Sequence, residues 1–128
     1  MSGDTYADRL AEFLVSISIG ALPDKVVRSA EICAMDYLGV VLAGQVTPAS
    51  AMVTELIRDE GGTPKATLLG KHVRVPASGA ALVNGTTCHS IELDDHEAHM
   101  RSKIHGGAVV FSPAWAVAEA HPTTGAEF

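Results

Sequence analysis

The sequence is short of charge, of aromatic side chains and of cysteine. Charged residues make up 19% of the 128 residues and aromatic residues 5%, and the acidic excess gives a formal net charge of −6. Nucleic-acid-binding domains usually carry a basic patch, so we expect no nucleic-acid partner. The two cysteines, Cys33 and Cys88, are too few for a disulfide framework and are typical of a reducing compartment.

Two further absences concern secretion and membranes. The opening MSGDTYADRL has neither the basic segment nor the apolar segment of a secretory signal. The longest uncharged run, from Tyr37 to Thr54, contains Gly39, Gly44 and Pro48. These residues interrupt it well short of the roughly 20 apolar residues that a membrane span needs. We therefore expect no membrane partner and a cytoplasmic location.

Hydrophobic residues, by contrast, make up 47% of the chain. With so few charges, such a chain exposes apolar surface unless something covers it. We expect either a homo-oligomer or association with a missing C-terminal portion. The final residues, TTGAEF, are typical of a turn before a further helix, and they indicate a fragment of a longer protein.

Helical periodicity and capping residues predict a mostly α fold, a bundle-like domain of about five helices. Asp4 or Thr5 can cap a first helix, whose apolar residues recur at helical spacing. Four more helices are predicted: from Pro23 to Gly44, from Pro48 to about Asp59, from Pro76 towards Ile91 and from about Gly107 to His121.

Three expectations concern packing. The second half of the helix that ends at Gly44 is apolar almost all round, so it should be buried on several sides, with Gly39 permitting close approach of another helix. Asp36 would then need a buried hydrogen-bond partner. Met52 and Leu56, with Val53 as a further candidate, should face inward from the following helix.

The periodicity changes between Ala66 and Val75. Two short runs, 66–69 and 72–75, flank Gly70-Lys71, a pattern typical of a β-hairpin. We therefore expect one small hairpin near 66–75, with His72 facing solvent.

One polar segment, between Ala80 and Val110, stands out from its apolar flanks. It contains four of the six histidines, four acids and two cations, among them His89, His96, His99, His105, Glu92, Asp94, Asp95, Arg101 and Lys103. Such a cluster between apolar runs costs stability unless it performs a task, which makes it the candidate functional site. The alternative is a solvated polar loop.

The most specific feature is His105-Gly106-Gly107, immediately before the last predicted helix. The first N–H groups of a helix are unpaired and carry partial positive charge, and glycines let a carboxylate approach them. The same field favours the neutral imidazole that a general acid or base requires. Arg101 and Lys103 can bind further anionic groups. The segment suits proton transfer on a carboxylate-bearing substrate; a glycine-rich helix entry with a surface histidine is the alternative.

A metal-binding module is an alternative of another class. Four potential ligands would share one helix face if the preceding helix continued, and imidazole with carboxylate suits zinc or iron. These are His89, Glu92, His96 and His99. Acids near a helix C-terminus oppose its dipole, so we expect the helix to end near 91–93 and no metal to be bound.

Several of these motifs together resemble a known family. Asn84-Gly85, His89, the run Glu92-Leu93-Asp94-Asp95 and His105-Gly106-Gly107 look like the signature of the MmgE/PrpD family. That signature typically reads NG…H…(D/E)-x-D-D…H-(P/G)-(G/S). The runs LPDKVVRSAEICAMDYLGVVLAG and GGTPKATLLGKHVRV look like the second helix and the hairpin of the family. The resemblance covers nearly the whole chain.

The family includes 2-methylcitrate dehydratase, cis-aconitate decarboxylase and an epimerase of iminodisuccinate, which perform acid–base chemistry on small di- and tricarboxylates. The resemblance implies a lyase or isomerase, 2-methylcitrate dehydratase-like, that needs no cofactor. His105 would then be the catalytic proton shuttle, and Glu92 and Asp95 would orient it or hold substrate hydroxyls. The implied substrate-binding residues are His96, Arg101, Lys103, Gly106 and Gly107.

The resemblance leaves the exact reaction open. His96 stands where decarboxylase-type members carry a small hydroxyl residue, and Gly106 replaces a frequent proline. Family members are several times longer, with a lid domain and further catalytic lysines and a tyrosine. Residues 1–128 would therefore be the N-terminal part of the helical domain, forming one wall of an active site and inactive alone. A non-catalytic assembly or dimerisation domain is the remaining alternative.

Overall fold

A computed structural model of the chain describes residues 5–96, 104–121 and 123–128. The elements in chain order are α1 (Tyr6–Ser16), the 3-10 turn η1 (Ile19–Ala21), α2 (Asp24–Gly44), α3 (Pro48–Glu60), β1 (Ala66–Leu68), β2 (Val73–Val75), α4 (Ala77–His89), the π-helical turn η2 (Gly107–Phe111) and α5 (Ser112–Ala120). The prediction of a mostly α fold with about five helices and one small hairpin is confirmed.

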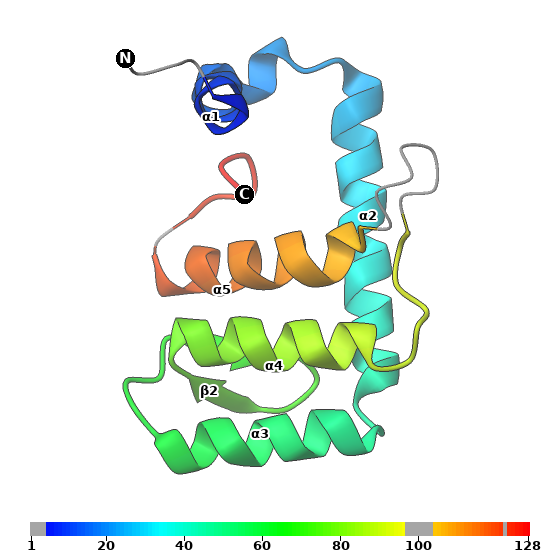
Figure 1. Ribbon diagram of the computed structural model, residues 1–128, viewed down its shortest axis with the longest axis vertical. Coiled ribbons are helices and arrows are strands. Elements are labelled where there is room, and N and C mark those ends of the chain that lie inside the picture. The colour runs from blue at the N-terminus through cyan, green and yellow to red at the C-terminus, as the bar shows by residue number, and fades with distance from the viewer. Residues whose placement is uncertain (1–4, 97–103, 122) are drawn as a thin grey trace.

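Helix α2 is the longest element and supports the others. In Figure 1 it runs down one side of the molecule, and α3, α4 and α5 lie across its lower half. Helix α4 is the central one, because it lies between α3 and α5 and also contacts α2 and both strands. Helix α1 lies apart at the other end, and none of its residues is buried.

The hairpin attaches to α4 and α5 through side chains. Its antiparallel strands pair Ala66 with Val75 and Leu68 with Val73, and they are shorter than predicted at three residues each. The amide of Asn84 on α4 accepts from the Leu69 N–H at 3.0 Å and donates to the Thr67 carbonyl at 3.0 Å. These bonds satisfy backbone groups at the hairpin edge that would otherwise be buried and unpaired.

Two apolar clusters form the core. The first joins the hairpin to α3, α4 and α5 through Ile57, Ala66, Leu68, Val75, Ala80, Val83 and Ala116. The second joins α2 to α4 and η2 through Tyr37, Val40, Val41, Cys88 and Ala108. The second cluster contains Cys88, the residue before the end of α4, and Ala108, near the start of η2. It therefore sets the positions of the two chain segments that flank the polar loop.

Gly44, at the end of α2, is where two helices come closest. A Cβ atom there would overlap the carbonyl oxygen of Thr87 on α4 and lie 3.0 Å from its carbonyl carbon. A Cβ at Gly39 would meet no atom of the described residues within 4 Å. The prediction that Gly39 permits close approach was therefore wrong, because the crossing point of α2 and α4 lies more than one turn further along α2.

Burial along α2 also differs from the prediction. Met35 is 65% exposed, and Asp36 and Leu42 are also exposed, whereas Tyr37 and Val41 are buried. Only one face of the second half is covered by described residues. Asp36 thus needs no buried partner.

Helix α3 presents a different face to the core than expected. Met52 and Leu56 are exposed, whereas Ser50 and Thr54 are buried. Val53, the further candidate, is partly buried and packs against the first cluster. Ser50 accepts from the Thr87 hydroxyl on α4 at 2.9 Å, and Thr54 packs beside it. Lys71 donates to the Thr54 hydroxyl at 2.8 Å. Small hydroxyl side chains let α3 approach α4 closely, and a hydrophobicity pattern does not show this.

The helix boundaries follow local chemistry. Thr5 forms a capping box with Asp8, as one of the two predicted caps. The last predicted helix is split, since residues 107–111 are π-helical and α5 begins at Ser112. Pro113 lacks an N–H and cannot bond back to the preceding turn, which accounts for the irregularity there.

No single helix within 5–96, 104–121 and 123–128 is both long and apolar enough to cross a membrane. In the part of the chain that the structure describes, α2 and α3 pass that test when taken together, with a bend of 91° between them.

Candidate functional site

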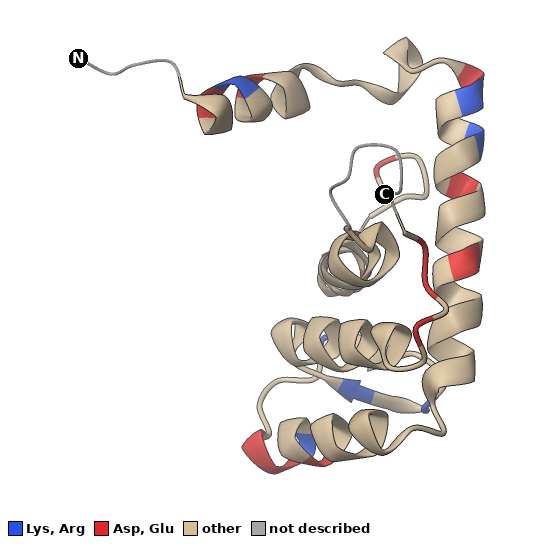
Figure 2. Ribbon diagram, turned by 45° about the vertical axis from the view of Figure 1, so that its right-hand side comes forward, with Lys and Arg blue, Asp and Glu red and all other residues tan. Residues whose placement is uncertain are grey.

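The site begins where α4 ends, at His89. The Glu92 N–H bonds the His89 carbonyl at 3.2 Å, and Glu92 has a φ of 52°, a left-handed conformation that is uncommon for a residue with a side chain. This turn sends the chain back beside α2, where the acidic residues of the segment are visible in Figure 2. Asp94 and Asp95 thereby reach the start of η2.

Asp95 occupies the N-terminal end of η2. Its carboxylate accepts a hydrogen bond from the Gly107 N–H at 2.5 Å. A Cβ on Gly107 would lie 2.6 Å from one carboxylate oxygen, and a Cβ on Gly106 would lie 3.0 Å from the other. The glycine pair does admit a carboxylate to the helix N-terminus, as its chemistry predicts. That carboxylate belongs to the chain itself.

Asp94 points the other way and joins two histidines. Its side chain is 1% exposed, and its Oδ2 lies 3.1 Å from Nδ1 of His89 and 3.2 Å from Nδ1 of His105. The two imidazole rings meet edge to face with centroids 4.6 Å apart. Asp94 thus connects the end of α4 to the residue that enters η2.

Asp94 belongs to the acidic motif of the sequence, but the motif by itself assigns it no role. One signal could have identified it. A carboxylate between two apolar runs needs hydrogen-bond partners if it is buried, and histidines lie five residues before it and eleven residues after it in the chain.

Two other predicted site residues, Glu92 and His96, lie near His89 and His105. Glu92 is 76% exposed on its side chain, and its Oε1 lies 3.5 Å from Nε2 of His89. The ring of His96, an exposed residue, has its centroid 5.5 Å from that of His105. Arg101 and Lys103, together with His99 of the metal alternative, lie outside the described residues. Glu92, which was expected to orient His105 or to hold substrate hydroxyls, contacts His89.

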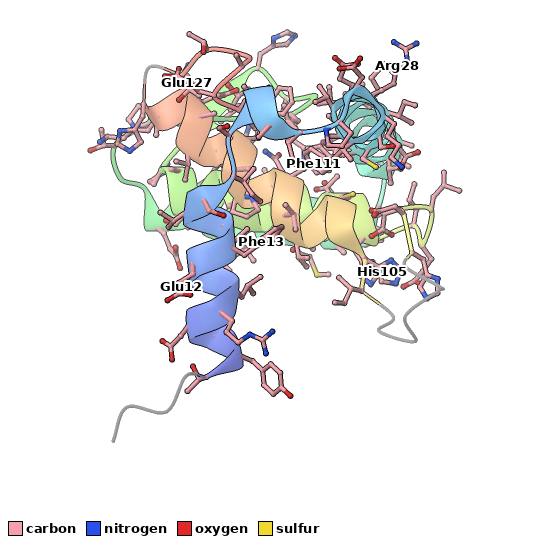
Figure 3. The ribbon with its side chains drawn as sticks, turned by 90° about the horizontal axis from the view of Figure 1, so that it is seen from above. Glu12, Phe13, Arg28, His105, Phe111 and Glu127 are labelled. Atoms are coloured by element: carbon pink, nitrogen blue, oxygen red, sulfur yellow. The ribbon has the colours of Figure 1, made fainter. Side chains whose placement is uncertain are left out.

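An open groove of about 720 Å³ adjoins the two histidines. His89 and His105 line it with the apolar residues Leu82, Ala108 and Val109. The His105 side chain is 27% exposed, and Figure 3 shows it at the end of the helical layer formed by η2 and α5. The groove therefore brings an accessible imidazole to the side of an apolar wall.

Two buried groups near the site, Cys88 and Tyr37, do not ionise near neutral pH. Burial, with the charges of Asp94, Asp95 and Asp36, raises the pKa of the Cys88 thiol to about 12. Burial also raises the pKa of Tyr37 to about 12, while its hydroxyl accepts a bond from Ser112 at 3.0 Å. Because both groups stay protonated, the groups available for acid–base chemistry are the imidazoles of His89 and His105 and the neighbouring carboxylates.

The residue types could also suit a metal ion. His89, Asp94 and His105 each offer one ligand atom, and these atoms lie within 4.8 Å of one another. Among the described members of the predicted metal stripe, His89 belongs to this set and Glu92 and His96 do not, because α4 ends at His89 and the helical spacing stops there. The hydrogen bond between Asp94 and His89, with the 3.2 Å contact between Asp94 and His105, explains the same arrangement without an ion.

Comparison with known proteins gives one family. The MmgE/PrpD N-terminal domain matches residues 8–128. Human cis-aconitate decarboxylase is 27% identical over 121 residues, which cover 92% of this chain and 24% of that enzyme. The mouse enzyme is 28% identical over the same shares. A cis-aconitate decarboxylase-like protein of Aspergillus oryzae is 24% identical over 110 residues, or 86% of this chain and 22% of that protein. No solved structure matches the chain significantly.

Proposed function

Because the chain belongs to the MmgE/PrpD family, we propose that it is the N-terminal segment of a cofactor-independent lyase or isomerase acting on small di- or tricarboxylates. The relatives named as cis-aconitate decarboxylases support a lyase. We propose dehydration of a 2-methylcitrate-like substrate, with decarboxylation of the cis-aconitate type as the alternative reaction.

One observation carries the proposal: His105 is partly accessible beside an open groove while its Nδ1 lies against a buried carboxylate. A histidine held in this way can take a proton from carbon next to a substrate carboxylate, or return one. His105 is the proposed proton shuttle. Glu92 and His96, both exposed, are proposed to contact the substrate at the rim, and Arg101 and Lys103 to bind its carboxylates.

For Asp95 we propose a structural role, in place of orienting His105 or holding substrate hydroxyls. Its carboxylate bonds the Gly107 N–H, and this contact holds the start of η2 against the acidic turn. Gly106 and Gly107 then serve the site by admitting Asp95. We propose that they shape the wall below the substrate.

The chain spans about a quarter of the length of the relatives it matches. We propose that residues 1–128 form part of a helical domain, and that the rest of the protein supplies the opposite wall of the site. Elimination needs an acid and a base on both sides of the substrate, and this chain offers one side. We therefore expect no enzyme-like turnover from residues 1–128 alone, whether as monomer or homo-oligomer.

The test is substitution of His105 in the full-length protein. His105→Ala should lower turnover of the active substrate, 2-methylcitrate or cis-aconitate, by about 10²–10⁴-fold, the usual scale for loss of a general acid or base. His72→Ala is the matched control, because His72 is exposed in the hairpin turn, away from the groove. Equal losses from both variants, or full activity of His105→Ala, would refute the assignment.

A further inference from the structure

We infer that Asp94 and His89 are positioning residues that hold His105 in the tautomer with its proton on Nδ1, so that Nε2 is the atom that accepts the substrate proton. The catalytic meaning of this inference rests on the proposed function. The tautomer itself does not, and it can be measured separately.

The environment of Nδ1 of His105 requires a proton there. The atom is buried, and it has no hydrogen-bond partner among the described residues. Its ionic neighbour is Oδ2 of Asp94 at 3.2 Å. An unprotonated Nδ1 would direct a lone pair at a carboxylate from a buried position, which is repulsive. A protonated Nδ1 is attracted to the same oxygen, and a small rotation of either side chain completes the hydrogen bond.

His89 holds the Asp94 carboxylate in place. Its Nδ1 lies 3.2 Å from Oδ1 and 3.1 Å from Oδ2. A carboxylate that is 1% exposed is costly without donors, and by the same reasoning Nδ1 of His89 must carry the proton. Nε2 of His89 lies 3.5 Å from Oε1 of Glu92. The four groups thus form one row, Glu92, His89, Asp94 and His105, that starts in solvent and ends at the groove.

The neighbouring charged groups do not compete for Nδ1 of His105. Asp95 is engaged by the Gly107 N–H. His96 approaches the ring of His105 with centroids 5.5 Å apart and forms no hydrogen bond to it.

The tautomer determines which ring nitrogen of His105 can accept a proton from the substrate. With the proton on Nδ1, the basic nitrogen is Nε2, and the exposed part of the ring lies away from the buried Nδ1. In enzymes where an aspartate holds a catalytic histidine in this way, replacement by asparagine leaves the geometry intact and lowers turnover about 10⁴-fold. We expect a loss of about 10²–10⁴-fold for Asp94→Asn in the full-length protein.

The direct test is nitrogen NMR of the chain labelled with ¹⁵N-histidine, in chelator-treated buffer above the imidazole titration range. The ring nitrogens of His105 and His89 should both report the Nδ1–H tautomer, whereas exposed His72 should favour Nε2–H, as free histidine does. Asp94→Leu should shift His105 towards Nε2–H. The same replacement at exposed Asp36 should leave His105 unchanged.

The outcomes separate this inference from the proposed function. A Nε2–H tautomer of His105 in the wild-type chain overturns the inference, even if Asp94→Leu fails to fold. A metal ion on Nδ1 would also leave the proton on Nε2 and overturn it. If His105 is Nδ1–H but His105→Ala keeps full turnover, the proposed function fails and the positioning of His105 stands. If turnover depends on His105 but not on Asp94, the proposed function stands and the inference fails.

Discussion

Gly44→Ala tests how closely α2 and α4 approach. The added Cβ would overlap the carbonyl oxygen of Thr87 and lie 3.2 Å from the hydroxyl of Ser90. The obstacle is mainly backbone, so no side-chain rotation relieves it. The two helices would have to separate by on the order of 1 Å, an overpacking change that costs about 1–3 kcal/mol or somewhat more.

Two opposing effects determine the net change in stability. Alanine is favoured over glycine in a helix by up to about 1 kcal/mol, and less at a helix end. Separation of α2 from α4 also loosens the second core cluster, in which Val41 and Cys88 are fully buried. We expect the free energy of unfolding to fall by about 2–3 kcal/mol, which for a chain of this size corresponds to a melting temperature lower by about 8–12 °C.

Gly39→Ala is the control, because it makes the same chemical change in the same helix. A Cβ at Gly39 meets no atom of the described residues within 4 Å, so only the helix preference acts, and stability should rise by about 0.5–1 kcal/mol. Urea unfolding followed by circular dichroism gives both values. If Gly44→Ala is as stable as the wild type, or if both variants change stability alike, the packing of α2 on α4 is not as described.

Three other expectations follow from the same structure. At pH 8 a thiol reagent should label the half-buried Cys33 and should not label Cys88 until the chain unfolds. The reason is that a rise in the pKa of Cys88 from 9.0 to about 12 lowers its thiolate fraction about 1000-fold. Equal labelling of the two cysteines by mass spectrometry would contradict the burial of Cys88. Exposed apolar side chains such as Phe13 and Met35 should make the chain self-associate or bind a hydrophobic dye. A compact monomer in light scattering that binds no dye would contradict this expectation. Protein purified without added metal should contain no stoichiometric zinc or iron; a full equivalent in elemental analysis would favour a metal site on His89, Asp94 and His105 instead.

Local chemistry determined the secondary structure. Thr5 caps α1, Pro48 opens α3, and Gly70 with a φ of 76° makes the hairpin turn, all at the predicted places. Each signal acts within a few residues of the chain, through a side-chain hydrogen bond or an allowed backbone angle. The family was recognisable for a related reason, since its motif is a linear spacing of residue types around Asn84, Glu92 and His105, and the match over residues 8–128 confirms it.

Residue spacing in the sequence does not show which glycine lies at a helix crossing or which group each acidic side chain contacts. The tertiary structure decided both. Gly39 and Gly44 are both helical glycines, and only the crossing of α2 with α4 shows which one is needed. Asp94 and Asp95 are neighbours in an irregular segment, where no period assigns a direction to each side chain. The left-handed turn at Glu92 and the position of η2 beside α4 send Asp95 to a backbone N–H and Asp94 to two imidazoles. The contacts of Asp94 with His105 and of Asp95 with Gly107 join groups more than ten residues apart, and they exist only after α4 and η2 have both packed on α2.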